Sequence, residues 1–151
     1  MLWNLYLRKD TVYLPTVAET DAGFFLDIEP VEVAAAGDID ALQHAVKQAI
    51  GRGNPKVPTP TRGAFPKPVV LKYANVKSWS AFAQSSSNWN IVEKNGLYQI
   101  TRGRKHPEGG GWEPDPTSTE DFPAGIGIDE IARRVASSVQ LAHRPGSAAG
   151  T

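Results

Sequence analysis

The chain is 151 residues long, has no cysteine, and carries 16 basic and 16 acidic residues, so its formal net charge is zero. Its length suits one domain with its own hydrophobic core, and the lack of cysteine excludes disulfides, cysteine zinc sites and thiol nucleophiles. Hydrophobic residues make up 40% of the chain, which excludes intrinsic disorder as an overall description.

The N-terminal sequence MLWNLYLRKD has neither the basic leader nor the small-residue cleavage site of a signal peptide. No apolar run reaches the roughly 18 residues that a membrane-spanning helix needs. We therefore expect a soluble, cytoplasmic protein with a single domain over 1–142. Residues 143–151 are expected to be a flexible tail or a non-native remnant.

Alternating apolar and polar residues predict a β-hairpin over 2–8 and 11–18 and a third strand over 23–33. Pro15 has no N–H for a strand ladder, so the second strand is expected at an edge of the sheet.

The third strand has two different faces. Phe24, Leu26 and Ile28 fall on one face, and Phe25, Asp27 and Glu29 fall on the other. Because successive side chains of a strand point to opposite faces, this apolar side is expected to be buried. Asp27 and Glu29 are then expected to face solvent rather than to hold a metal, since no further ligands accompany them.

A helix is predicted over 38–50, because its first residue is a good N-cap and apolar residues recur behind it at three- and four-residue spacing. Five prolines make the segment 54–68 an extended crossing. A short strand is expected over 69–74, followed by a short helix around Trp79.

The dipeptide Asn95-Gly96 predicts a second hairpin, over 88–94 and 97–103, because both residues tolerate the positive φ angles of a two-residue turn. The pairs expected on one face are Trp89 with Arg102, Ile91 with Ile100, and Glu93 with Tyr98.

The segment 103–127 has no periodicity and is expected to be a long loop, after which apolar spacing predicts a C-terminal helix over 128–142. Together the elements predict an α+β fold, with an antiparallel or mixed β-sheet of about five strands packed against two main α-helices plus one short helix. The two main helices are expected to cover one face of the sheet.

Charge is segregated along the chain. Residues 10–40 hold eight acids and no base, residues 47–105 hold eleven bases and one acid, and residues 106–130 hold seven acids and no Lys or Arg. Either these blocks interleave in space and neutralise one another, or at least one forms a single-sign face that steers a charged partner.

The sequence lacks the P-loop, the nucleophile elbow, the H-E-x-x-H zinc motif and the EF-hand loop. We therefore expect no enzyme activity, no catalytic residue, no cofactor and no metal. One alternative stays open: the cluster from Arg102 to His106 could bind phosphate, which would make the chain a small nucleic-acid-binding protein or RNase.

Four segments carry a resemblance to a known family. They are Trp3-Asn4-Leu5-Tyr6, Asp27-Ile28-Glu29-Pro30-Val31, Gly53-Asn54-Pro55-Lys56-Val57-Pro58 and Leu71-Lys72-Tyr73-Ala74-Asn75-Val76-Lys77-Ser78-Trp79. With them the chain resembles the immunity proteins of bacterial contact-dependent growth-inhibition systems over about residues 1–140. The resemblance implies a monomer that binds the C-terminal toxin domain of its own system, a nuclease in many cases, in a 1:1 complex without membrane or nucleic acid. These motifs are scaffold features, so they transfer no site residue.

An inhibitor of a basic nuclease is expected to bind it through acidic surface, and two segments of this chain are acidic. A long acidic loop with an aromatic residue is the composition of a binding loop, although Trp112 and Phe122 could instead fix that loop to the body. The residues predicted to bind the partner are Glu108, Trp112, Glu113, Asp115, Glu120 and Asp121 in the loop, and Asp21, Asp27, Glu29 and Glu32 near the N-terminus.

Overall fold

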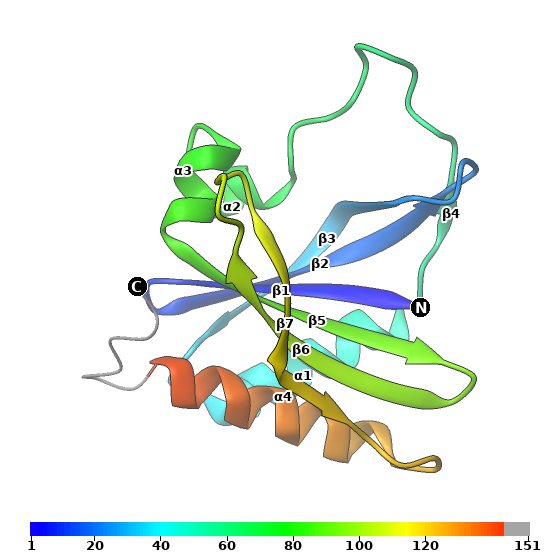
Figure 1. Cartoon of the computed structure of the whole chain (residues 1–151), viewed down its shortest axis with the longest axis vertical. Coiled ribbons are helices and arrows are strands. Elements are labelled where there is room, and N and C mark those ends of the chain that lie inside the picture. The colour runs from blue at the N-terminus through cyan, green and yellow to red at the C-terminus, as the bar shows by residue number, and fades with distance from the viewer. Residues whose placement is uncertain (144–151) are drawn as a thin grey trace.

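The computed structural model describes residues 1–143 and has the expected α+β architecture, with one sheet and helices on both of its faces (Figure 1). The strands are β1 (Leu2–Arg8), β2 (Thr11–Thr20), β3 (Phe25–Ala35), β4 (Lys56–Val57), β5 (Ser86–Lys94), β6 (Leu97–Lys105) and β7 (Trp112–Asp121). The helices are α1 (Ile39–Gly51), α2 (Val70–Ala74), α3 (Trp79–Gln84) and α4 (Ile128–His143).

Six strands lie in the order β3-β2-β1-β5-β6-β7, and every pair of neighbours is antiparallel. The short strand β4 pairs with the end of β2 in parallel. The sheet therefore has more strands than the five predicted, and β3 and β7 form its two long edges.

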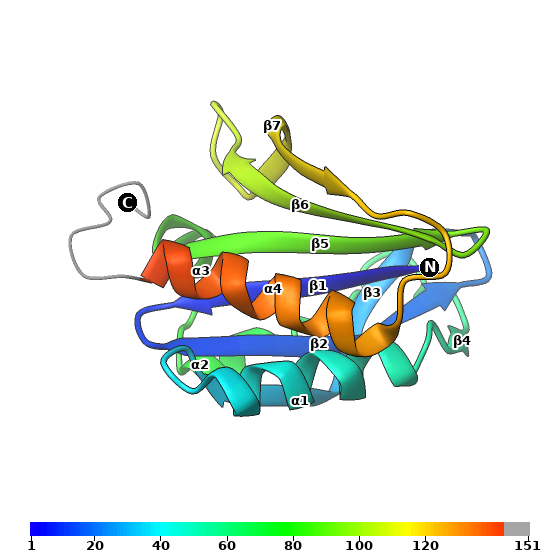
Figure 2. The same cartoon turned by 90° about the horizontal axis from the view of Figure 1, so that it is seen from below.

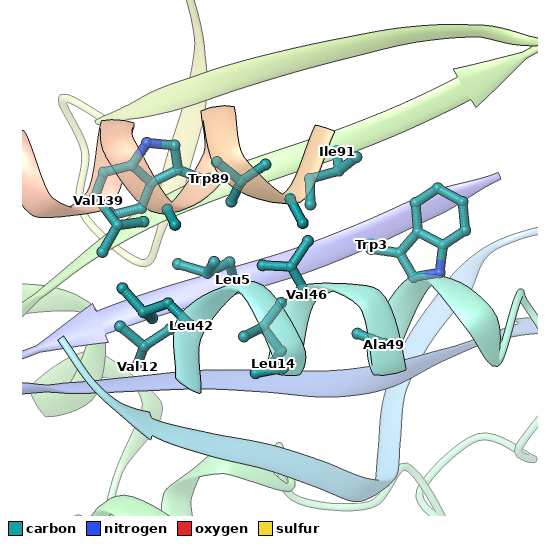
Figure 3. Packing of buried hydrophobic residues seen from close by; sticks show 14 of the residues in the cluster. Trp3, Leu5, Val12, Leu14, Leu42, Val46, Ala49, Trp89, Ile91 and Val139 are labelled. Carbon is teal, nitrogen blue, oxygen red and sulfur yellow. The ribbon is translucent and has the colours of Figure 1, made fainter. Parts of the chain in front are cut away.

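Helices α1 and α4 pack side by side on one face of the sheet, which confirms the prediction for the two main helices (Figure 2). On this face Leu5 and Leu14 lie near Leu42 and Val46 of α1, and Trp3 lies near Ala49 toward the end of that helix (Figure 3). All six residues are fully buried. Each fully buried Leu or Val side chain contributes about 1.5–3 kcal/mol through the area it removes from water. This layer is the main hydrophobic core.

Local signals explain the β5–β6 hairpin and α1. The Asp38 side chain accepts a hydrogen bond from the Ala41 N–H at 3.1 Å, so it caps α1 as predicted. The β5–β6 hairpin turns at Asn95 and Gly96, both with positive φ, and the three predicted cross-strand pairs are all present. The prediction of a short helix around Trp79 is also confirmed, because α3 begins at that residue.

Three local predictions are wrong. The segment 69–74 forms α2 instead of a strand, and the segment 103–127 contains the ten-residue strand β7. Strand β2 lies between β3 and the central part of the sheet instead of at an edge. Pro15 is tolerated there because the register of β2 against β3 shifts between Pro15 and Thr16, at an irregularity where no ladder N–H is required.

The faces of β3 also differ from expectation. Phe24 precedes the strand and is exposed, and Leu26 and Ile28 are only half-buried. Asp27 is half-buried too, because the opposite face of the sheet is covered in its turn by α2, α3 and the segment that leads to them. Both sides of β3 therefore lie against other parts of the chain.

The C-terminal helix is one residue longer than predicted and ends at His143, whose ring nitrogen lies 2.8 Å from an Asp10 carboxylate oxygen. Residues 144–151, the rest of the predicted tail, lie outside the described residues.

Candidate functional site

The sheet face opposite α1 and α4 carries a second, smaller hydrophobic cluster. Tyr6 and Tyr13 pack there against Val70, Leu71 and Phe82 of the two short helices. These tyrosines reach this face because they alternate along β1 and β2 with the residues of the main core. The cluster fixes α2 and α3 on this face of the sheet.

Trp112 belongs to this cluster. Its ring centroid lies 5.8 Å from that of Tyr6 and 5.8 Å from that of Trp79. A Cβ at Gly103 would lie 2.9 Å from the Cβ of Trp112, so only glycine allows β7 to bring the tryptophan this close. The Nε1 of Trp79 donates a hydrogen bond to the Gly110 carbonyl at 2.8 Å, which ties the β6–β7 turn to α3.

A groove with a volume of about 690 Å³ lies between β3 and the segment that runs into α2. Its apolar wall combines prolines of the crossing with side chains of β3 and α2 and with Val76, two residues after α2. The lining residues are Asp27, Ile28, Glu29, Pro66, Lys67, Pro68, Val69, Leu71, Lys72, Val76 and Lys77. This size is in the range of pockets that enclose small ligands or several side chains of a partner.

A second hollow of about 280 Å³ adjoins the groove and shares Asp27 and residues 66–68 with it. It extends across the sheet to Asn4, Tyr6 and Trp79. The two hollows therefore adjoin along β3, where residues 25–27 line one and residues 27–29 line the other, and together they are called the cleft.

Asp27 lies where the two hollows meet. The Tyr6 hydroxyl donates a hydrogen bond to Oδ2 at 2.6 Å, and the Asn4 Nδ2 donates one to Oδ1 at 2.7 Å. Asn90 in turn donates from Nδ2 to the Asn4 Oδ1 at 2.6 Å. Burial raises the pKa of Asp27, and the hydrogen bonds from Tyr6 and Asn4 offset only part of that rise.

Glu29 is the other carboxylate of the groove and is exposed. It accepts hydrogen bonds from the Lys72 ammonium and the Tyr73 hydroxyl. The hydrogen bond from Lys72 is the largest cause that lowers the pKa of Glu29, and the one from Tyr73 is the next. Glu29 is thus an ionised group whose charge is compensated within the chain.

Two lysines at the groove differ from Lys72. Lys67 and Lys77 are exposed, and within residues 1–143 neither makes a salt bridge. Apolar surface continues beyond the groove, because Phe24 and Phe65 are both exposed and stack with ring centroids 5.9 Å apart.

The acidic and basic blocks of the sequence interleave in space, as one of the two interpretations requires. The ion pairs that join different blocks are Glu19 with Lys56, Glu29 with Lys72, Glu32 with Arg52, Glu113 with Arg104, and Asp129 with Lys47. Much of the charge that is segregated in sequence is therefore paired in the folded chain.

The residues predicted to bind a partner fall into two groups on different parts of the sheet. Asp27, Glu29 and Glu32 lie on β3, whereas Trp112, Glu113, Asp115, Glu120 and Asp121 lie on β7, at the opposite edge (Figure 1). The fold brings Asp27 and Glu29 together in the groove, but it does not unite the two groups.

The individual acids also differ in their partners. Asp115 accepts hydrogen bonds from the Thr117 N–H and hydroxyl, and Asp121 accepts one from Gln99 at 2.7 Å. Glu120 lies 3.7 Å from Arg134. Asp21 and Glu108 are exposed, and neither makes a salt bridge within residues 1–143.

In the basic cluster of the alternative hypothesis, Arg102 to His106, the basic side chains contact different neighbours. The Arg102 guanidinium lies 5.2 Å from the centre of the Trp89 ring, and Arg104 pairs with Glu113. Lys105 donates to the Gln84 carbonyl, and the Nδ1 of His106 accepts a 3.3 Å hydrogen bond from the backbone of the same turn.

Sequence reasoning missed Asn4, Tyr6, Lys67 and Lys77 as site residues. Asn4 and Tyr6 alternate with the core residues of β1, so the pattern itself placed two polar side chains on the second face. For the two lysines no local signal exists, because their position at a groove depends on how the proline-rich crossing folds over β3.

Among residues 1–143, no group of three or more His, Asp or Glu side chains could hold a metal ion. No helix within the same residues is both long and apolar enough to cross a membrane.

The amino-acid sequence matches no protein-family model, and no significant match to a curated protein was found. The fold, in contrast, is similar to that of solved structures. A protein of unknown function from Neisseria meningitidis, NMB0488, has a TM-score of 0.61 and 13% sequence identity, over 91% of this chain and 93% of that one.

A chain from a structure described as the CdiA-CT/CdiI toxin and immunity complex from Yersinia pseudotuberculosis is also similar. Its TM-score is 0.60 and its sequence identity is 11%, over 95% of this chain and 97% of that one. The chain therefore shares its fold, from end to end, with a component of a toxin–immunity complex.

Proposed function

We propose that this chain is a cytoplasmic immunity protein that binds and neutralises the C-terminal toxin domain of its own contact-dependent growth-inhibition system. The observation that carries the proposal is the fold shared with a chain of a toxin and immunity complex, which covers 95% of this chain and 97% of that one. The likeness therefore extends over nearly all of both chains.

The surface of the molecule supports a binding function. A preformed cleft that joins two hollows along β3 offers apolar contact area and a few oriented polar groups, the combination on which recognition sites are built. In this proposal the protein is no enzyme and needs no cofactor or metal, because it acts by occupying a surface of the toxin as a monomer in a 1:1 complex.

Co-expression tests the proposal. The gene for a large secreted protein is expected immediately upstream, and its C-terminal domain is produced in bacteria with or without this chain. We expect cells to survive only when this chain is present, and the two purified proteins to elute as a 1:1 complex. A toxin domain from an unrelated system serves as the control and is expected to kill in both cases. Equal killing by the upstream domain with and without this chain would contradict the proposal.

The acidic surfaces predicted from the sequence can be examined in the same assay. Glu108→Lys and Asp21→Lys each reverse an exposed acid that has no salt bridge within residues 1–143. If either surface steers a basic toxin, its reversal lowers the association rate and the dependence of that rate on salt. Deleting 108–121 is unsuitable, because it removes β7, and Trp112→Ala would also disturb the packing of Tyr6 and Trp79.

A further inference from the structure

We infer that the cleft along β3 takes an acidic, apolar segment of the partner protein, with Lys67 and Lys77 as the cations that receive it. The inference rests on the proposed function for the identity of the partner, the toxin domain, and on the geometry of the cleft for the chemistry of the segment. The inference gives a role to the basic segment 47–105. An inhibitor that binds only through acidic surface would leave that segment without a role.

The walls of the groove call for an apolar occupant. Its lining includes Ile28 of β3, the apolar residues Val69, Leu71 and Val76, and the prolines Pro66 and Pro68. Apolar surface left in water is unfavourable, and it is covered when a partner inserts apolar side chains.

The charges at the groove call for an occupant that is also acidic. Both carboxylates of the groove already accept hydrogen bonds, Asp27 from Asn4 and Tyr6, and Glu29 from Lys72 and Tyr73. Asn4 and Tyr6 are neutral and leave the charge of Asp27 in place, so the lining carries three lysines, Lys67, Lys72 and Lys77, against two carboxylates.

Lys67 and Lys77 then remain as two positive charges beside an apolar wall, without a salt bridge in the described chain. An anion brought against such a wall is attracted more strongly than in bulk water, because the effective dielectric constant is lower there.

The length of the cleft favours a peptide segment over a compact small molecule. The groove and the adjoining hollow follow β3 in succession and share Asp27 and residues 66–68. The exposed rings of Phe24 and Phe65 extend the apolar surface beyond the residues that line the groove. An extended segment that carries both apolar and acidic side chains matches these features.

A capped peptide tests the groove without the toxin. Acetyl-Glu-Leu-Phe-Glu-amide is titrated into the full-length, ¹⁵N-labelled protein and followed by NMR. We expect amide shifts confined to the segments that line the cleft, 4–6, 25–29 and 65–79, and binding that weakens as ionic strength rises. The charge-reversed peptide acetyl-Lys-Leu-Phe-Lys-amide should bind about tenfold more weakly or not at all. Equal binding of the two peptides, or shifts elsewhere in the protein, would overturn the inference.

Charge reversal in the protein provides the matching experiment. The double variant Lys67→Glu/Lys77→Glu should weaken binding of the acidic peptide about tenfold. The control Lys9→Glu/Lys94→Glu changes the net charge by the same amount at two exposed lysines that do not line the cleft, and it should bind as the wild type does.

The toxin assay separates this inference from the proposed function. If the wild type and the groove double variant neutralise the toxin equally well, the inference is overturned and the proposed function is retained. Peptide binding at the groove without any neutralisation would overturn the function and retain the acidic specificity of the groove. Self-association of the wild type that the groove variant abolishes, measured by sedimentation, would make a second copy of the chain the occupant and overturn the inference.

Discussion

At the scale of single residues, the main feature is that two carboxylates of one strand have opposite environments. Asp27 is half-buried, and its pKa is raised because burial disfavours the charged form. Glu29, two residues further, is exposed, and its pKa is lowered because Lys72 and Tyr73 donate hydrogen bonds to the charged form. Both side chains were expected to face solvent alike, and only their neighbours in space make them differ.

This difference predicts opposite pH dependences for two conservative variants. Between the ordinary pKa of Asp27, 3.8, and its raised value, the folded state binds more protons than the unfolded state, so wild-type stability falls as pH rises through that window. Asparagine does not ionise, so the free energy of unfolding of Asp27→Asn does not fall in this way. It should therefore increase relative to that of the wild type as pH rises through the window. The hydrogen bond that it loses, worth about 0.5–1.5 kcal/mol, should lower stability equally at every pH.

Glu29→Gln should show the reverse. The folded-state pKa of Glu29 is lowered from 4.5, so its contribution is present above that pH and is lost as pH falls through the folded value. The free energy of unfolding of Glu29→Gln should be lower than that of the wild type near neutral pH, and this difference should become smaller as the pH falls. Urea unfolding of the three proteins at several pH values between about 3 and 7 measures both trends, and parallel curves for all three would show that neither carboxylate is perturbed.

At the scale of elements, α4 shows how one apolar stripe docks a helix. Ile131, Val135 and Val139 follow one another at four-residue spacing and are fully buried against the sheet and α1, whereas Leu141 on the same helix is 56% exposed. Strand β7, in contrast, contains Pro114 and Pro116 and no apolar alternation, so its existence depends on pairing with β6. Prolines are compatible with it because it lies at an edge of the sheet.

The buried stripe predicts a large contrast between two truncations within α4. Ile131→Ala should lower the free energy of unfolding by about 2–5 kcal/mol, because it removes buried methyl groups and leaves a cavity. Leu141→Ala should change it by less than about 0.5 kcal/mol, because its side chain is mostly in water already. Chemical denaturation monitored by tryptophan fluorescence measures both, and similar losses would mean that α4 packs in a different rotation.

At the scale of the whole molecule, the net charge of zero comes from blocks that pair across the fold rather than from an even mixture along the chain. The basic cluster that ends at His106 belongs to this pattern, because Arg104 pairs with Glu113 and Arg102 stacks on Trp89. The lysines at the groove, Lys67 and Lys77, stand outside it. Pairing therefore leaves a local positive region at the cleft in a molecule that is neutral overall.

This distribution predicts that the purified protein leaves RNA intact. Cleavage needs a base, an acid and groups that stabilise the developing charge at one place, and the cations around His106 already contact other parts of the protein. Labelled single-stranded RNA incubated with the protein should run unchanged on a denaturing gel across pH 5 to 8. Cleavage that disappears in His106→Ala would favour the RNase hypothesis over the immunity function.

The sequence by itself determined the features that depend on local spacing. A capped run of apolar residues at helical spacing is sufficient for α1, and Asn95-Gly96 determines the β5–β6 register because only a two-residue turn with positive φ can close that hairpin. The position of α4 and the placement of both main helices on one face follow from their single apolar stripes. Each of these signals lies within about twenty residues of the chain.

Tertiary structure alone decided the features that depend on distant neighbours. Strand β7 has almost no local β-pattern and forms because β6 offers an unpaired edge, and α2 forms where the crossing packs on Tyr6 and Tyr13 although its residues favour a strand. The candidate site is of the same kind: Asp27 meets Asn4 and Tyr6 from β1, and Lys67 reaches the groove through the proline-rich crossing. The contacts at Asp27 join residues more than twenty positions apart, so their geometry is set by the packing of the whole domain and not by any spacing along the chain.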